Sequence, residues 1–160
     1  MSSRGLYRAP ALVPLSREHH DALVHALWLR QRAGRPDAAG AFLDFYRREL
    51  VGHMADEEEV VLVAAETVDP AGTARIREEH ADLRGLAVTL ESAVAAGAPL
   101  ADPMEAVGRL LHDHVRYEER IFFKSLQAAL SGAALDALGA ALEAHRAARG
   151  VPAACAIRPR

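Results

Sequence analysis

Residues 43–64, LDFYRRELVGHMADEEEVVLVA, combine a helical apolar stripe with charged groups that lie inside it. At 100° per residue the stripe runs through Leu43, Leu50, Met54, Val61 and Ala64. His53 and Glu57 fall within the stripe, one helical turn apart, whereas Asp56 and Glu59 fall away from it. Burying a histidine and a carboxylate is costly unless they are paired or bound to a metal. The stretch therefore predicts a helix that carries ionisable groups into the core.

The same His-x-x-x-Glu pattern recurs in residues 104–130. His114 and Glu118 lie on the apolar face of this second helix, and His112 points elsewhere. The apolar residues predicted for that inner face are Leu110, Leu111, Tyr117, Ile121 and Phe122. A lone His-x-x-x-Glu pair is usually a helix-surface pair, so its position on an inner face in two helices is the informative feature.

Two further helices each point one histidine inward. His80 aligns with Ile76, Leu83, Ala87, Leu90 and Val94. Near the N-terminus the predicted stripe is Leu23, Val24, Leu27 and Trp28. His20 lies near the centre of that stripe and His19 on its flank, so His20 is preferred and His19 is the alternative. His25 and His145 have no such neighbours and are expected on the surface.

Proline and glycine divide the chain into helices, with Ser16 as the first N-cap, and with Asp102 as a cap and Pro103 at the first position of the fourth helix. The first predicted helix ends at about residue 33, and the next three span about 38–67, 73–95 and 104–130. A shorter helix is predicted at 133–149. No stretch alternates as a strand would. The predicted fold is all-α, an antiparallel up-and-down four-helix bundle with a short additional C-terminal helix. We expect one domain over residues 1–160, with its bundle core at about 15–130.

Four helices that each point a histidine at a shared core, two of them with a carboxylate one turn later, predict a metal site. Imidazole and carboxylate together are ligands of iron, manganese and zinc. Two carboxylates on facing helices can each bridge a pair of metals, and six protein ligands leave positions open for a small molecule. Glu58, Glu59 and Glu119 are expected either in solvent or beside the ligands, and Glu58 and Glu119 are the pair preferred beside the ligands.

These residues resemble the hemerythrin-like (HHE cation-binding) family. The matching stretches are LSREHH (15–20), HMADEE (53–58), EHADL (79–83) and HVRYEE (114–119). The resemblance implies an oxo- or hydroxo-bridged centre of two non-haem irons, although the donor atoms suit manganese and zinc as well. It implies His20, His53, His80 and His114 as terminal ligands, with Glu57 and Glu118 as the bridges.

Two departures set the chain apart from the oxygen-carrying members of that family. Those have a second histidine one turn away on the third helix, where this chain has Ile76 and Arg84. Their last carboxylate is an aspartate one residue further on, where this chain has Glu118. The chain is more similar to the bacterial four-histidine members, which weakens simple oxygen transport as the function. The ferritin-like bundles are set aside because no Glu-x-x-His occurs here.

Composition excludes several other classes. The net charge of −3 gives no basic footprint for nucleic acid and no polybasic membrane anchor. The single cysteine, Cys155, allows neither an internal disulfide nor a thiolate metal site. No run approaches the ~18 apolar residues of a membrane span. A cytoplasmic protein is expected.

Three functions fit the predicted site. In the first, dioxygen, nitric oxide or peroxide binds at an open iron position, and the protein senses or buffers it. In the second, an oxidoreductase consumes peroxide or nitric oxide, with Tyr117 as a donor if it faces the pocket. In the third, the bundle handles iron or acts as a scaffold. We favour a binding protein over a dedicated enzyme, with output to a partner protein or a second copy through a surface such as the C-terminal helix.

Overall fold

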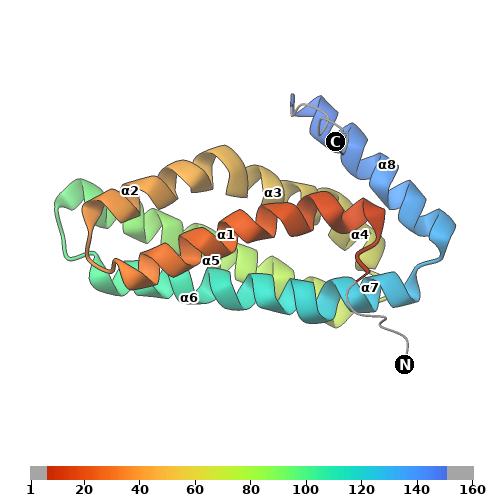
Figure 1. Cartoon of the computed structure of the whole chain (residues 1–160), viewed down its shortest axis with the longest axis horizontal. Coiled ribbons are helices and arrows are strands. Elements are labelled where there is room, and N and C mark those ends of the chain that lie inside the picture. The colour runs from red at the N-terminus through yellow and green to blue at the C-terminus, as the bar shows by residue number, and fades with distance from the viewer. Residues whose placement is uncertain (1–6, 151–160) are drawn as a thin grey trace, which may run out of the picture.

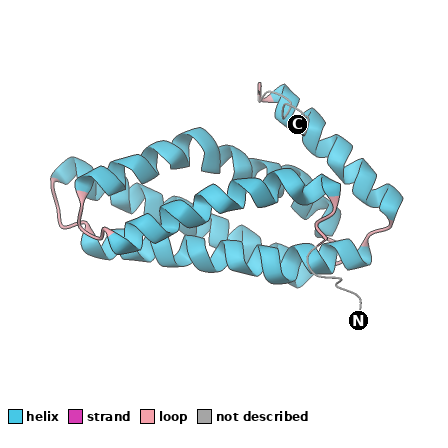
Figure 2. Cartoon of the chain, viewed as in Figure 1, coloured by secondary structure: helices cyan, strands magenta, loops and turns pink. Residues whose placement is uncertain are grey.

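The computed structural model describes residues 7–150, and within that range the chain is helical with no strand (Figure 2). Cys155 lies outside the described residues. After a 3-10 turn, η1 (Pro10–Leu12), the helices form five rods. Rod 1 is α1 (Val13–Gln31), rod 3 is α5 (Pro70–Ala96) and rod 5 is α8 (Gly132–Ala148). Rod 2 consists of α2 (Pro36–Phe45), the π-helical turn η2 (Tyr46–Leu50), α3 (Val51–Asp56), the π-helical turn η3 (Glu57–Val61) and α4 (Leu62–Ala65). Rod 4 consists of α6 (Ala101–Tyr117), the π-helical turn η4 (Glu118–Phe122) and α7 (Phe123–Ala129).

The first four rods lie side by side, and α8 lies at an angle to them over the end that holds α4 and α7 (Figure 1). The prediction of an all-helical chain with an additional C-terminal helix is confirmed. Within the described residues, no helix is long and apolar enough to cross a membrane.

Local sequence signals set most of the rod ends. Asp69 accepts a hydrogen bond from the Gly72 N–H and starts α5, and Ser131 accepts one from the Ala134 N–H at the start of α8. Gly97 ends α5 at a φ of 62°, a left-handed conformation that favours glycine.

Two predicted caps are wrong. Ser16 lies inside α1, because Pro14 fits the first turn of a helix that already begins at Val13. Asp102 is not a cap, since α6 begins at Ala101 without a side-chain cap and Asp102 lies in its first turn. A carboxylate there still interacts favourably with the positive end of the helix dipole.

The core consists of two apolar clusters with a polar layer between them. One cluster includes Ala26, Leu83 and Leu111, and the other includes Leu15 and Phe122. In each of the first four rods, buried ionisable residues lie between the residues of one apolar cluster and those of the other. The buried ionisable residues of this layer are His19, His53, Glu57, His80, His114 and Glu118.

The predicted inner face of α1 is wrong by a rotation of about one residue. Leu27 and Trp28 are 50% and 41% exposed, and the face that packs inward carries small side chains at Ala22 and Ala26. On rod 4, Ile121 is likewise exposed rather than inward. The larger side chains misled the prediction because close packing of α1 on α6 requires small residues at the contact.

Asp56 was predicted to face away from the core, but it is buried beneath α8. Its carboxylate binds Arg146, Arg149 and His145, with Nε of Arg146 at 2.8 Å and Nδ1 of His145 at 2.9 Å. His145 is thus a partly buried docking residue and not a free surface group. His25 is half-buried as well, stacked on Phe45 at a ring distance of 4.2 Å.

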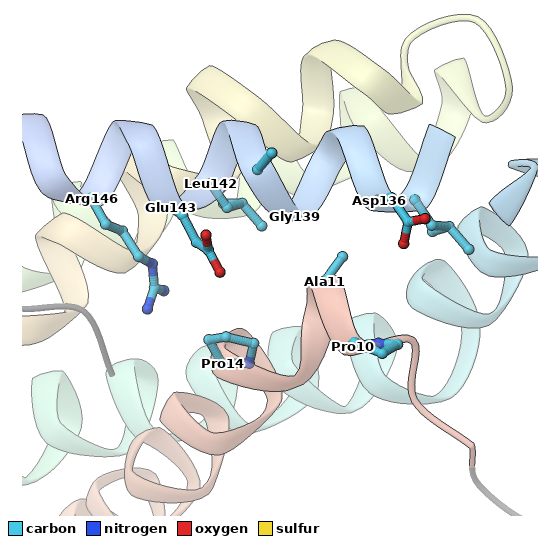
Figure 3. A pocket seen from close by; sticks show the side chains of 10 residues that line it. Pro10, Ala11, Pro14, Asp136, Gly139, Leu142, Glu143 and Arg146 are labelled. Carbon is cyan, nitrogen blue, oxygen red and sulfur yellow. The ribbon is translucent and has the colours of Figure 1, made fainter. Parts of the chain in front are cut away.

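A cavity of about 310 Å³ separates part of α8 from η1 and the first turn of α1 (Figure 3). Pro10, Ala11 and Pro14 line it on one side, and Leu142 and Arg146 are among the α8 residues on the other. None of the buried ionisable residues of the polar layer borders this cavity.

The close approach of α1 and α6 gives a stability prediction. A Cβ on Gly108 would lie 2.8 Å from the backbone oxygen of Ala26, whereas nothing lies within 4 Å of a Cβ on the exposed Gly85. Gly108→Ala should therefore lower the free energy of unfolding by about 1–3 kcal/mol through overpacking. The matched Gly85→Ala should raise it by about 0.5–1 kcal/mol. Denaturant unfolding of both variants checks this, and equal shifts would contradict the packing described.

Candidate metal centre

The polar layer brings four imidazoles and two carboxylates together at the middle of the rods. Their ligand atoms form two groups, each within 4.8 Å, that could hold one metal ion apiece. Position 1 comprises His19, His53, Glu57 and Glu118, and position 2 comprises His80, His114, Glu57 and Glu118. All six side chains are buried. Because both groups contain the same two glutamates, each carboxylate can face two ions at once.

His19, and not His20, is the α1 histidine of this layer. His19 is 2% exposed and its Nε2 lies 3.0 Å from Oε2 of Glu118, whereas His20 is exposed. The preference for His20 followed from the misplaced apolar stripe of α1, and the true stripe of Leu15, Ala22 and Ala26 has His19 at its centre. The other five predicted site residues are brought together as expected.

The Nε2 atoms of the four histidines point at the shared carboxylates. Nε2 of His53 and Nε2 of His80 each lie 3.3 Å from an oxygen of Glu57, one from Oε1 and the other from Oε2. Nε2 of His114 lies 3.3 Å from Oε2 of Glu118. The two oxygens of Glu57 therefore face different histidine pairs.

The Nδ1 atoms of the same histidines bind a second set of glutamates. The four pairs are His19–Glu119 at 2.7 Å, His53–Glu18 at 2.8 Å, His80–Glu58 at 2.9 Å and His114–Glu79 at 2.8 Å. Burial raises the pKa of Glu119, but hydrogen bonds, led by that from His19, lower it to about 2. An ionised carboxylate can only accept, so Nδ1 must carry the proton. In the neutral ring, the lone pair is then on Nε2 and points inward.

An arginine holds each outer glutamate in turn. Arg146 Nη1 lies 2.8 Å from Glu18, Arg84 Nη1 2.9 Å from Glu58, Arg75 Nε 2.7 Å from Glu79, and Arg8 pairs with Glu119. Each imidazole is thereby fixed in orientation by a charge-assisted chain that ends in a guanidinium.

The inner atoms of the layer fit a cation. Nε2 of His19 and Nε2 of His53 lie 3.0 Å apart, so two neutral rings in the tautomer above would turn lone pair toward lone pair. Both oxygens of Glu57, both oxygens of Glu118 and Nε2 of His80 are buried without a hydrogen-bond partner of good geometry. Such a set of unpaired acceptors is unfavourable unless protons or metal ions lie among them.

The electrostatics agree with that conclusion. Burial disfavours the charged form of His53, yet the charge of Glu57 and the bonds to Glu18 and Glu57 raise its pKa to about 9. Burial also raises the pKa of Glu57, but the surrounding histidines lower it well below its usual range. The carboxylate therefore stays ionised, and a metal ion would take the place of the proton that His53 otherwise holds.

The two positions are related by an internal repeat in the sequence. Glu18, His19, His53, Glu57 and Glu58 of the first half correspond, at one constant offset, to Glu79, His80, His114, Glu118 and Glu119 of the second. The π-helical turns that begin at Glu57 and at Glu118 follow the same offset. The repeat gives each position two histidines and the same kind of supporting glutamates.

Glu18 and Glu79 are the residues that sequence reasoning missed. The expectation that Glu58 and Glu119 lie beside the histidines is confirmed. The available signal was the dipeptide Glu-His, which occurs at 18–19 and again at 79–80, at the offset of the internal repeat. It also distinguishes His19 from His20, since the repeat pairs position 20 with an alanine at 81.

Tyr117, the residue considered as a donor to the site, is only partly buried. The Arg75 guanidinium carbon lies 3.7 Å from the centroid of its ring. Its ring therefore packs against the arginine that holds Glu79.

A helical bundle with buried histidine and glutamate groups of this kind has the residues to hold metal ions. The family model described as "Hemerythrin HHE cation binding domain" matches residues 12–126, well over half of the chain, and the chain belongs to that family. Comparisons with curated proteins and with solved structures gave no match.

Adjacent histidines provide a direct test of the assignment on α1. His19→Ala should remove metal from position 1 and lower the metal content per chain, because a buried ligand is lost. His20→Ala should leave the content unchanged, because its side chain is exposed. Metal analysis of both variants after identical purification measures this. A larger loss in the His20 variant would reverse the assignment.

The outer glutamates give a second prediction. Glu79→Gln should weaken metal binding about 10- to 100-fold, because the amide replaces the ionised acceptor that orients His114. Glu78→Gln removes the same charge one residue earlier, from an exposed side chain, and should have little effect. Competition with a chelator of known affinity gives both constants. Equal weakening in the two variants would show a general charge effect instead.

Proposed function

We propose that the protein binds two non-haem iron ions in the polar layer, one at position 1 and one at position 2, and takes up a small ligand there. The observation that carries this proposal is the sharing of Glu57 and Glu118 between two histidine pairs. Family membership supports iron, and the donor set of imidazole and carboxylate suits it. We also infer that rods 1–4 form an antiparallel up-and-down four-helix bundle around the centre.

Each position has two imidazoles and shares two carboxylates, which leaves coordination sites of an iron ion for an exogenous molecule. Iron would supply reversible redox chemistry and an affinity for dioxygen, nitric oxide or peroxide. The chain's own residues fix the ligand geometry through the outer glutamates and arginines, and the two apolar clusters exclude water from either end. Binding or sensing of such a molecule is the function that we propose.

The test begins with protein produced in iron-supplemented medium and purified without chelator. We expect close to two irons per chain and charge-transfer absorption in the near ultraviolet. His53→Ala and His114→Ala should each lower the iron content to one or fewer. Removing iron with a chelator should lower the melting temperature, since metal that binds the native state stabilises it.

The small-ligand part is tested on the same protein. Adding nitric oxide to the reduced form, or azide to the oxidised form, should change the visible spectrum. Unchanged iron in both histidine variants would contradict the metal assignment. Iron that responds to neither ligand would contradict an open coordination position while leaving the assignment of the ligands intact.

A further inference from the structure

A second cavity, of about 330 Å³, lies between α1, rod 4 and Arg8 of the segment before η1, and we call it the basic cavity. Its lining includes Arg8, His19, Arg116, Glu119, Arg120 and Lys124. His19 is a member of position 1, so the cavity reaches a wall of the metal centre from outside.

Positive charge dominates the basic cavity. Arg116, Arg120 and Lys124 follow one another at intervals of four residues along rod 4, and their side chains are exposed. Within residues 7–150 none of the three has an acidic group at ion-pair distance. Glu119, the carboxylate that lines the cavity, is already bound by Arg8 and by Nδ1 of His19. The cluster also opposes the net charge of −3 of the whole chain.

The internal repeat supplies a comparison within the same molecule. The positions that its offset relates to Arg116, Arg120 and Lys124 are Ala55, Glu59 and Val63. The first half of the repeat therefore has the same kinds of histidine and glutamate as the second half, but none of the three cations. The three cations are therefore not needed to build the ligand set, and they distinguish the approach to position 1 from the approach to position 2.

We propose that the basic cavity is the entrance through which small inorganic anions, of the class of azide, nitrite and hydroperoxide, reach the metal centre at position 1. This inference rests on the proposed function and adds the charge class and the route of its ligand. Cations around a cleft with low-dielectric walls concentrate anions and raise their association rate by about 10- to 1,000-fold. A neutral gas gains nothing from the same field.

The test compares an anion with a neutral ligand. The cavity variant carries Arg116→Gln, Arg120→Gln and Lys124→Gln. The control variant carries Arg35→Gln, Arg77→Gln and Arg109→Gln, which removes the same charge from exposed sites outside the basic cavity. Stopped-flow absorbance gives the association rate of azide with the oxidised iron protein and of nitric oxide with the reduced protein.

We expect azide association to slow about tenfold in the cavity variant and to lose most of its dependence on ionic strength. Nitric oxide association should stay within twofold of the unaltered protein in both variants, and the control variant should keep its azide rate. An azide rate within twofold of the unaltered protein in the cavity variant would overturn the proposal. Equal slowing of azide and nitric oxide would overturn it too, because the cations would then not select for charge.

A second arm separates this proposal from the proposed function. In zinc-loaded protein, which is diamagnetic and redox-inert, azide titration should shift the backbone amide resonances of residues 116, 120 and 124 ahead of those of 55, 59 and 63. Shifts there support the anion site even if the iron protein shows no spectral response. No shift at the first set overturns the entrance, even if iron binds nitric oxide normally.

Discussion

The arrangement of this protein depends on two buried carboxylates, Glu57 and Glu118, that face four imidazole nitrogens with no protein donor between them. A layer of acceptors in a dry interior is unfavourable by itself, and it becomes favourable when cations occupy it. The outer glutamates and arginines serve the same end, because they fix the proton on each Nδ1 and leave Nε2 free to face inward. The apolar clusters on either side keep the layer dry, and the free energy of folding and the affinity for metal are coupled as a result.

The internal repeat explains why the ligand geometry is symmetric and the surroundings are not. Each half supplies two histidines, one glutamate that both positions share and two supporting glutamates. The arginines that hold them differ in origin. At position 2, Arg84 and Arg75 both come from α5, whereas at position 1 Arg146 comes from α8 and Arg8 from the segment before η1. Among the described residues, the outer arginines of position 1 thus come from elements outside the four rods, and those of position 2 come from within them.

The same asymmetry governs how charge is distributed outside the bundle. On one side α8 brings Arg146 and Arg149 onto the buried Asp56, and Asp56 and Glu18 together balance their charge. On another, the cations of rod 4 that line the basic cavity have no acidic partner within the described residues, and they lie beside His19. The first arrangement stabilises the docking of a helix, and the second leaves an unbalanced field in which an anion is attracted.

The sequence by itself determined the helical class, the positions of most turns and five of the six inner residues. It could do so because helical periodicity shows, for each helix separately, that a His-x-x-x-Glu pair lies on the apolar face. The tertiary structure corrected the choice between His19 and His20, since large side chains at Leu27 and Trp28 drew the predicted stripe toward His20 while small ones at Ala22 and Ala26 make the real contact. The internal repeat of the sequence favours His19 as well, but periodicity within one helix does not detect it. The tertiary structure also decided the partners of Glu18, Glu79 and Asp56. Those partners lie far away in the sequence, and periodicity within one helix carries no information about which carboxylate of a neighbouring helix will reach a given ring or guanidinium.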